Sequence, residues 1–150
     1  MAAAVAVRVS NFHGKKEHRE VRNAAKAGFH LIMVMAVISS AVVLLFRNRL
    51  GFLFSESAEV AVMVSYLVIP FVVYQFGDGL QCNYSNALRG ISDVKMVSWY
   101  ALIAYFIISL PAGYLFGFVF DLGLVGVWLS FPLGLTSAGI MFWHRFREAV

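Results

Sequence analysis

Four long runs of uncharged residues alternate with short charged segments along the chain. Each run holds no Asp, Glu, Lys or Arg over about 18–25 residues, which is the length that a helix needs to cross roughly 30 Å of hydrocarbon. The runs lack the alternation of a half-buried strand, and backbone groups in lipid must be satisfied within one segment, so we expect helices. The runs are Ala27–Phe46, Val60–Gly77, Met96–Phe120 and Leu122–Trp143.

This pattern predicts an all-α membrane protein with spans over about 27–46, 60–86, 96–120 and 122–143. The N-terminal stretch MAAAVAVRV lacks the basic segment of a signal peptide and is interpreted as the last turns of a further helix. Hydrophobic residues make up 61% and charged residues 13% of the 150 residues, against about 45–50% and about 25% in a soluble domain. The expected partner of the whole chain, 1–150, is therefore a lipid bilayer.

The basic residues are distributed unevenly over the connections between these spans. Of the 12 Lys and Arg residues, ten lie in the segment 8–26, in the connection 89–95 or in the C-terminal tail, and two lie in the connection 47–59. Cytoplasmic loops carry the excess of Lys and Arg, so we predict a cytoplasmic loop over 8–26 and a cytoplasmic C-terminus in the plasma (cell inner) membrane. The net charge of +4 follows from this bias, and no nucleic-acid partner is expected.

Asp78 is a charged residue that the apolar pattern does not explain. It lies in the second span about 11 residues, or roughly 16 Å of helix, before Arg89, which places it near the middle of the bilayer. A carboxylate exposed to lipid is costly, so Asp78 is expected to face protein or an aqueous cavity and to be neutralised by a proton or a sodium ion. We interpret it as a cation-binding residue, with a structural hydrogen bond to a neighbouring helix as the alternative.

Polar residues accompany Asp78 at helical spacing. Tyr74, Gln81 and Ser85 are spaced so that they share one face of the helix with it. Their side-chain oxygens are the ligand type that hard cations bind, and stripes of this kind also hold helices together. We predict that these residues line a cavity or a cation site around the aspartate.

Two further features of this region concern helix packing. Gly77 and Gly79 flank the aspartate and are expected to allow another helix to approach closely. On the next span, Ser98, Tyr105 and Ser109 share a face. We interpret that face as a packing surface, with lining of the cavity, by Tyr105 in particular, as the alternative.

No arrangement typical of an enzyme or a metal site is present in the sequence. There is no nucleophile paired with a base, no Gly-rich phosphate loop and no pair of catalytic carboxylates. His13 and His18 lie in a charged segment without ligands at metal-site spacing. The single cysteine, Cys82, cannot form an intrachain disulfide. We therefore expect neither an enzyme nor a metal site.

Four stretches of the chain resemble, in the same order, motifs of the multidrug and toxic compound extrusion (MATE) transporters. VRVSNFHGKKE resembles the Arg-Val-Gly-Asn…Gly stretch after the eighth helix of that family. QFGDGLQCNYSNALRGISD resembles its Asp-Gly-Leu-Gln…Leu-Arg-Gly-x-Gly-Asp segment on and after the tenth helix. SLPAGYLFGF and LGLVGVWLS resemble the Leu-Pro-x-Gly-Tyr and Leu-Gly-x-x-Gly-x-Trp-Leu motifs of the last two helices. Ser10 and Ser92 stand where these motifs have glycine.

The resemblance implies a partial C-terminal lobe of a twelve-helix fold, made of four transmembrane helices and the end of a fifth. It implies an antiporter that moves drug-like or cationic organic substrates out and sodium or protons in. Asp78 is then implied to bind the coupling ion, Na⁺ or H⁺, with no cofactor besides it. The remaining helices of the transporter are the implied partners. Arg89, Gly90 and Asp93 match the loop motif, which implies a structural or gating role.

Alternating access needs two lobes that move about a shared site, so we predict that this chain does not transport alone. The alternative is a small four-helix membrane protein that acts as an oligomeric small multidrug transporter. A further alternative is a non-transporting subunit in which Asp78 is only structural. Small transporters usually carry their acid in the first helix, whereas Asp78 lies in the second full span.

Overall fold

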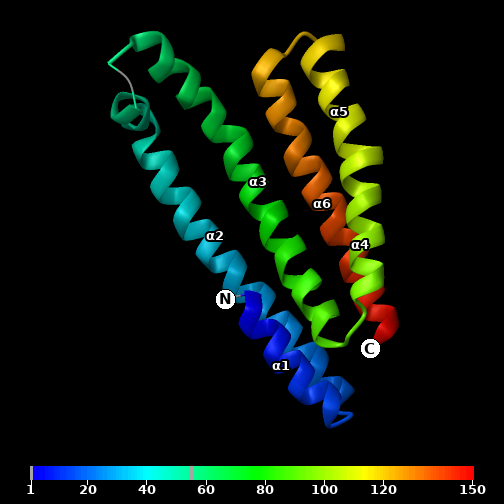
Figure 1. The fold of residues 1–150 in the computed structure, drawn as a ribbon. Helices are drawn as coiled ribbons and strands as arrows, with labels where there is room; N and C mark the ends of the chain where they lie inside the picture. The colour runs from blue at the N-terminus through cyan, green and yellow to red at the C-terminus, as the bar shows by residue number, and fades with distance from the viewer. Residues whose placement is uncertain (1, 55) are drawn as a thin grey trace.

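The computed structural model describes residues 2–54 and 56–150, which form helices joined by short turns, and this part of the chain contains no strand (Figure 1). The all-α prediction is confirmed. In chain order, the elements are α1 (Ala2–Gly14), α2 (His18–Phe54), α3 (Ala58–Gly90), α4 (Val94–Leu102), the π-helical segment η1 (Ile103–Ser109), α5 (Leu110–Tyr114), the π-helical segment η2 (Leu115–Val119) and α6 (Gly123–Ala149).

Within the described residues, four helices are long and apolar enough to cross a membrane, as the four uncharged runs predict. They cover His18–Leu53, Ala58–Gly90, Val94–Val119 and Gly123–Ala149. The third is continuous from α4 to η2, with π-helical turns on both sides of α5. The short helix α1 stands where the end of a fifth helix is predicted.

The segment 8–26 differs from its prediction, because most of it is helical rather than a loop. α1 continues to Gly14 and α2 begins at His18, which leaves only a short turn between them. This segment contains Ala, Glu, Lys and Arg, which favour helices in water as well as in lipid. An uncharged run therefore marks the part of a helix that fits hydrocarbon, and the helix itself continues beyond it.

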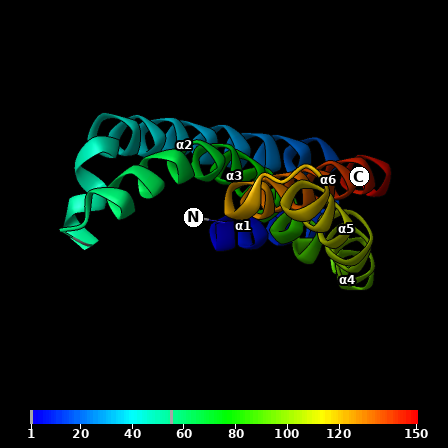
Figure 2. The same ribbon diagram turned by 90° about the horizontal axis from the view of Figure 1, so that it is seen from above.

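α3 is the central helix of the bundle. It packs along α2 on one side and α6 on the other, and it also contacts α1 and α4. In Figure 1 and Figure 2, α2 and α3 run side by side, and α6 lies between α3 and the helix built from α4 to η2. A residue on α3 can therefore face either neighbour, according to its position around the helix.

The buried core lies at one end of this bundle. There α1, the first turns of α2, the last turns of α3 and the end of α6 meet, and Val9, Val21, Leu88 and Phe142 are fully buried. Elsewhere the helices are far more exposed. In the most apolar stretch of α2, only 11% of the residues are buried within the described chain, against 39% in that of α6. Apolar helix surface of this extent suits contact with lipid or with further helices.

The turn between α3 and α4 is tied to the end of α6. The Nε atom of Arg145 donates a hydrogen bond to Oδ2 of Asp93 at 2.7 Å, within an ion pair that is only partly exposed. In the same turn, Ser92 has a φ of 67°, in the left-handed region that glycine adopts without steric cost. The position therefore suits the glycine that the resembled motif has there.

We expect Ser92→Gly to raise the stability of the chain by about 1 kcal/mol, because glycine removes the Cβ strain of a left-handed residue. Ser10→Gly is the matched control. Ser10 lies inside α1, where glycine lowers helix stability by about 0.5 kcal/mol relative to serine. Thermal unfolding of both variants in detergent measures the difference. Equal shifts in the same direction would contradict the strain at Ser92.

Candidate functional site

Asp78 lies half-buried in the C-terminal half of α3, beside a hollow of about 330 Å³ between α2 and α3. The thiol of Cys82, one turn further along α3, donates a long hydrogen bond to its Oδ1 atom, with 3.8 Å between sulfur and oxygen. Within residues 2–54 and 56–150, Asp78 forms no ion pair with a basic side chain. The lining residues are Ile32, Met35, Ala36 and Ser39 of α2 and Gln75, Asp78 and Gly79 of α3.

The two glycines beside Asp78 fix how α3 sits between its neighbours. A Cβ atom at Gly77 would lie 2.8 Å from Oγ1 of Thr136 on α6, and one at Gly79 would lie 2.8 Å from the terminal methyl carbon of Met33 on α2. Real Cβ atoms do not approach other atoms so closely. The prediction of close helix approach is confirmed at Gly77, where backbone atoms of α6 also lie within 3.3 Å of the Cβ position, whereas Gly79 is contacted by side-chain ends of α2.

Gln81 and Tyr105 are brought together from different helices. The Nε2 atom of Gln81 donates a hydrogen bond to the hydroxyl oxygen of Tyr105, which joins α3 to η1. Ser109, further along the same helix, is buried and donates to the carbonyl oxygen of Ser130 at 3.2 Å. The predicted packing face of this helix is thus engaged at Tyr105 with α3 and at Ser109 with α6.

The other two residues of the predicted stripe have local partners. Ser85 is buried, and its hydroxyl donates to the carbonyl oxygen of Cys82 in its own helix at 3.2 Å. Tyr74 lies one turn before Asp78, and its ring stacks against Phe71 with 6.3 Å between centroids. Tyr74 and Asp78 therefore remain neighbours on one helix face, while the hydroxyl of Ser85 is directed to the backbone.

Three polar residues near the site have roles that sequence reasoning missed. Ser40 on α2 donates to Oε1 of Gln75 at 3.0 Å, next to the hollow that Asp78 lines. Asn83 is fully buried and its Nδ2 atom donates to the carbonyl oxygen of Ala25 at 3.1 Å, which joins α3 to α2. The sequence signal that could have found Gln75 and Asn83 is their spacing, because it places them on the faces of α3 that adjoin the predicted polar stripe.

Among the residues that line the hollow, Asp78, Ser39 and Gln75 carry side-chain oxygens, which are the ligand type that hard cations bind. Among the residues that the structure describes, no three His, Cys, Asp or Glu side chains form a group that could hold a metal ion. One carboxylate in this position offers a group that can take up a proton or pair with a cation.

Comparison with known proteins gives a consistent result over nearly the whole chain. A family model described as MatE matches residues 1–115. Multidrug resistance protein MdtK from Cronobacter sakazakii is 34% identical over 151 residues, which is 98% of this chain and 33% of that protein. The chain thus spans about one third of the length of this relative.

Two solved structures share the fold. The crystal structure of the eukaryotic MATE transporter AtDTX14 superposes with a TM-score of 0.86 at 24% identity, covering 99% of this chain and 35% of that one. The inward-facing conformation of a multidrug resistance MATE family transporter of the MOP superfamily gives a TM-score of 0.81 at 19% identity, covering 99% and 34%. The helices of this chain are therefore arranged as in one third of a longer transporter fold.

A double-mutant cycle on Gln81 and Tyr105 measures how strongly the site is tied to η1. We expect Gln81→Leu and Tyr105→Phe each to lower the thermal stability in detergent, with a coupling of about 0.5–1 kcal/mol between them. Ser98→Ala is the control, because the hydroxyl of Ser98 bonds within its own helix, to the carbonyl oxygen of Val94. Additive effects of Gln81→Leu and Tyr105→Phe would show that the hydrogen bond contributes nothing.

Proposed function

This chain belongs to the MatE family, and from that premise we propose that it is part of a cation-coupled multidrug efflux antiporter. The antiporter would reside in the cell inner membrane and exchange drug-like or cationic organic substrates for sodium ions or protons. Support comes from the four helices that can span a bilayer and from a relative named for multidrug resistance. A transporter of this kind is not an enzyme.

We assign binding of the coupling cation to Asp78. The observation that carries this assignment is a half-buried carboxylate within a membrane-spanning helix, beside a hollow and without a basic partner in the described chain. Such a carboxylate is stable in a bilayer when a cation or a proton neutralises it. Tyr74 lies one turn before Asp78 on the same helix face, and Gln81 and Tyr105, joined by their hydrogen bond, are further candidates for lining the cation site. The proposed coupling ion is Na⁺ or H⁺, with no other cofactor.

The distribution of charge supports an orientation with both the segment 8–26 and the C-terminus in the cytoplasm. The helical structure of that segment leaves this assignment unchanged, because the positive-inside rule counts basic residues irrespective of secondary structure. In this orientation the packed core lies toward the cytoplasmic side. Asp78 then lies above it, toward the middle of the membrane.

The family match favours this proposal over an oligomeric small multidrug transporter, because the matched relative is about three times as long as this chain. The substrate path of a two-lobed transporter lies between the lobes. The remaining helices of the transporter are therefore the partners that would complete the path. A role as a non-transporting subunit would differ in having no cation at Asp78.

Labelling by dicyclohexylcarbodiimide tests Asp78 directly, since this apolar reagent modifies protonated carboxyl groups within membranes. We expect modification of Asp78, detected by peptide mass spectrometry of the chain in lipid vesicles. If sodium is the coupling ion, Na⁺ should slow the labelling and choline should not. If protons couple, labelling should fall as the pH rises, whether or not Na⁺ is present.

The control for this labelling is Asp121→Asn, which removes a carboxylate from the exposed turn between η2 and α6. It should leave the labelling and its cation dependence intact, whereas Asp78→Asn should abolish both. Labelling of Asp78 that responds neither to Na⁺ nor to pH would contradict the proposed cation site.

We further expect vesicles that contain only this chain to show no cation-driven efflux of a cationic dye. The physical reason is that one third of the fold does not form two sides of an alternating-access cavity. Dye efflux driven by a sodium or proton gradient, and lost in Asp78→Asn, would instead favour the small oligomeric transporter. Empty vesicles and the Asp78→Asn chain provide the baseline.

A further inference from the structure

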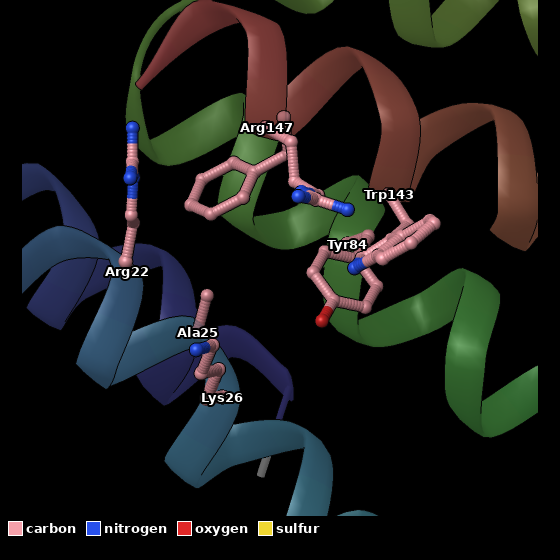
Figure 3. Close-up of a pocket in the computed structure, with 7 residues that line it drawn as sticks. Arg22, Ala25, Lys26, Tyr84, Trp143 and Arg147 are labelled. Carbon is pink, nitrogen blue, oxygen red and sulfur yellow. The ribbon is translucent and has the colours of Figure 1, made fainter.

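A second hollow, of about 460 Å³, lies at the core end of the bundle, on the side where α2 faces α6. Figure 3 shows Arg22 and Lys26 on α2, Trp143 and Arg147 on α6, and Tyr84 of α3 between them. The hollow is lined by Arg22, Ala25, Lys26, Tyr84, Trp143, Phe146 and Arg147. It is distinct from the Asp78 hollow, with which it shares no lining residue.

Three cations face this hollow, and no carboxylate lines it. In the described part of the chain, none of Arg22, Lys26 and Arg147 takes part in an ion pair. The guanidinium of Arg147 instead lies over the ring of Trp143, with 4.9 Å from its carbon to the ring centroid. Arginine and lysine gathered without an acidic partner form a site for an external anion, and guanidinium groups match the oxygens of a phosphate in particular.

The neighbouring carboxylates are engaged elsewhere. Glu148 pairs with His144 at 3.4 Å on the exposed side of α6. Glu20 accepts a hydrogen bond from Asn23 at 3.4 Å. Neither carboxylate therefore pairs directly with a cation of the hollow.

The hollow lies at the level where apolar helix gives way to charged helix. Lys26 directly precedes the first uncharged run, and Trp143 ends the last one. In a bilayer this level coincides with the headgroups, where Trp, Tyr, Lys and Arg are typical neighbours of lipid. The aromatic rings of Tyr84, Trp143 and Phe146 provide the apolar floor that a lipid needs below its phosphate and that a free phosphate ion does not.

We propose that this hollow binds the phosphate of an anionic phospholipid. Arg22, Lys26 and Arg147 hold the phosphate, and the three aromatic side chains contact the glycerol and the first carbons of the acyl chains. Basic pockets between membrane helices bind anionic headgroups by this combination of charge and apolar contact. The site is separate from the transport function proposed above, so a negative result for either leaves the other open to test.

Quenching of Trp143 by brominated lipids measures this binding in the full chain. Trp99→Phe and Trp128→Phe provide a background in which the emission comes from Trp143, because the chain has only 3 tryptophans. The chain in a neutral detergent is titrated with brominated phosphatidylglycerol or brominated phosphatidylcholine. We expect tighter binding of the anionic lipid, and no displacement of it by inorganic phosphate.

Removing the cations should weaken this binding. One cation near an anionic lipid contributes about 1 kcal/mol, which corresponds to roughly fivefold in affinity. The triple variant Arg22→Gln, Lys26→Gln and Arg147→Gln should therefore lose on the order of 100-fold. The matched control removes three exposed cations outside the hollow, with Arg8→Gln, Lys15→Gln and Lys16→Gln.

The outcomes separate the sources of the anion. Selective loss in the hollow variant, with the control unchanged, supports the lipid site. Equal quenching by the two lipids, or an equal loss in both triple variants, overturns it. Competition by inorganic phosphate overturns the lipid assignment in favour of a soluble phosphate. If gel filtration shows that the triple variant does not fold, the single variant Lys26→Gln provides the same test, with an expected loss of affinity of about fivefold.

Discussion

Close approach of α3 to both of its neighbours is the constraint on which the rest of this structure depends. In a bilayer, lipid solvates an apolar helix as well as another helix does, so association rests on tight packing and interhelical hydrogen bonds. Gly77 lets α3 meet Thr136 of α6, and Gly79 lets it meet Met33 of α2. Asp78 lies between these two contacts, and its position is thus set by the packing on both sides.

The interhelical hydrogen bonds of α3 follow from this packing. Gln75 bonds to α2, Gln81 to η1 and Asn83 to the backbone of α2. Three polar side chains of α3 therefore each form a hydrogen bond to another helix. Such bonds contribute about 0.6 kcal/mol each in membrane proteins, but they fix the rotation of α3 about its axis. That rotation turns Asp78 toward the hollow beside α2, where Cys82 of its own helix is its hydrogen-bond partner.

The parts of this structure that local pattern determines were predictable from sequence. Uncharged length predicted the four spans, and helical spacing predicted that Tyr74 and Asp78 share a face. The segment 8–26 was not predicted to be helical, because charge excludes a segment from hydrocarbon without excluding it from a helix. The pairing of Gln81 with Tyr105, and the hollow lined by Arg22, Tyr84 and Arg147, depend on contacts between distant segments that spacing along one helix does not specify.

The apolar helix faces and the carboxylate of Asp78 place different demands on their surroundings. The exposed apolar faces of α2 and α3 are satisfied equally by lipid or by the remaining helices of a transporter, because dispersion contacts with either are similar. The carboxylate of Asp78 is not satisfied equally by these two surroundings. Contact with hydrocarbon would require it to be protonated, whereas a polar cavity would allow a bound cation. Further helices against this bundle would therefore change little for the apolar helix faces and would act mainly on whether the surroundings of Asp78 are hydrocarbon or a polar cavity.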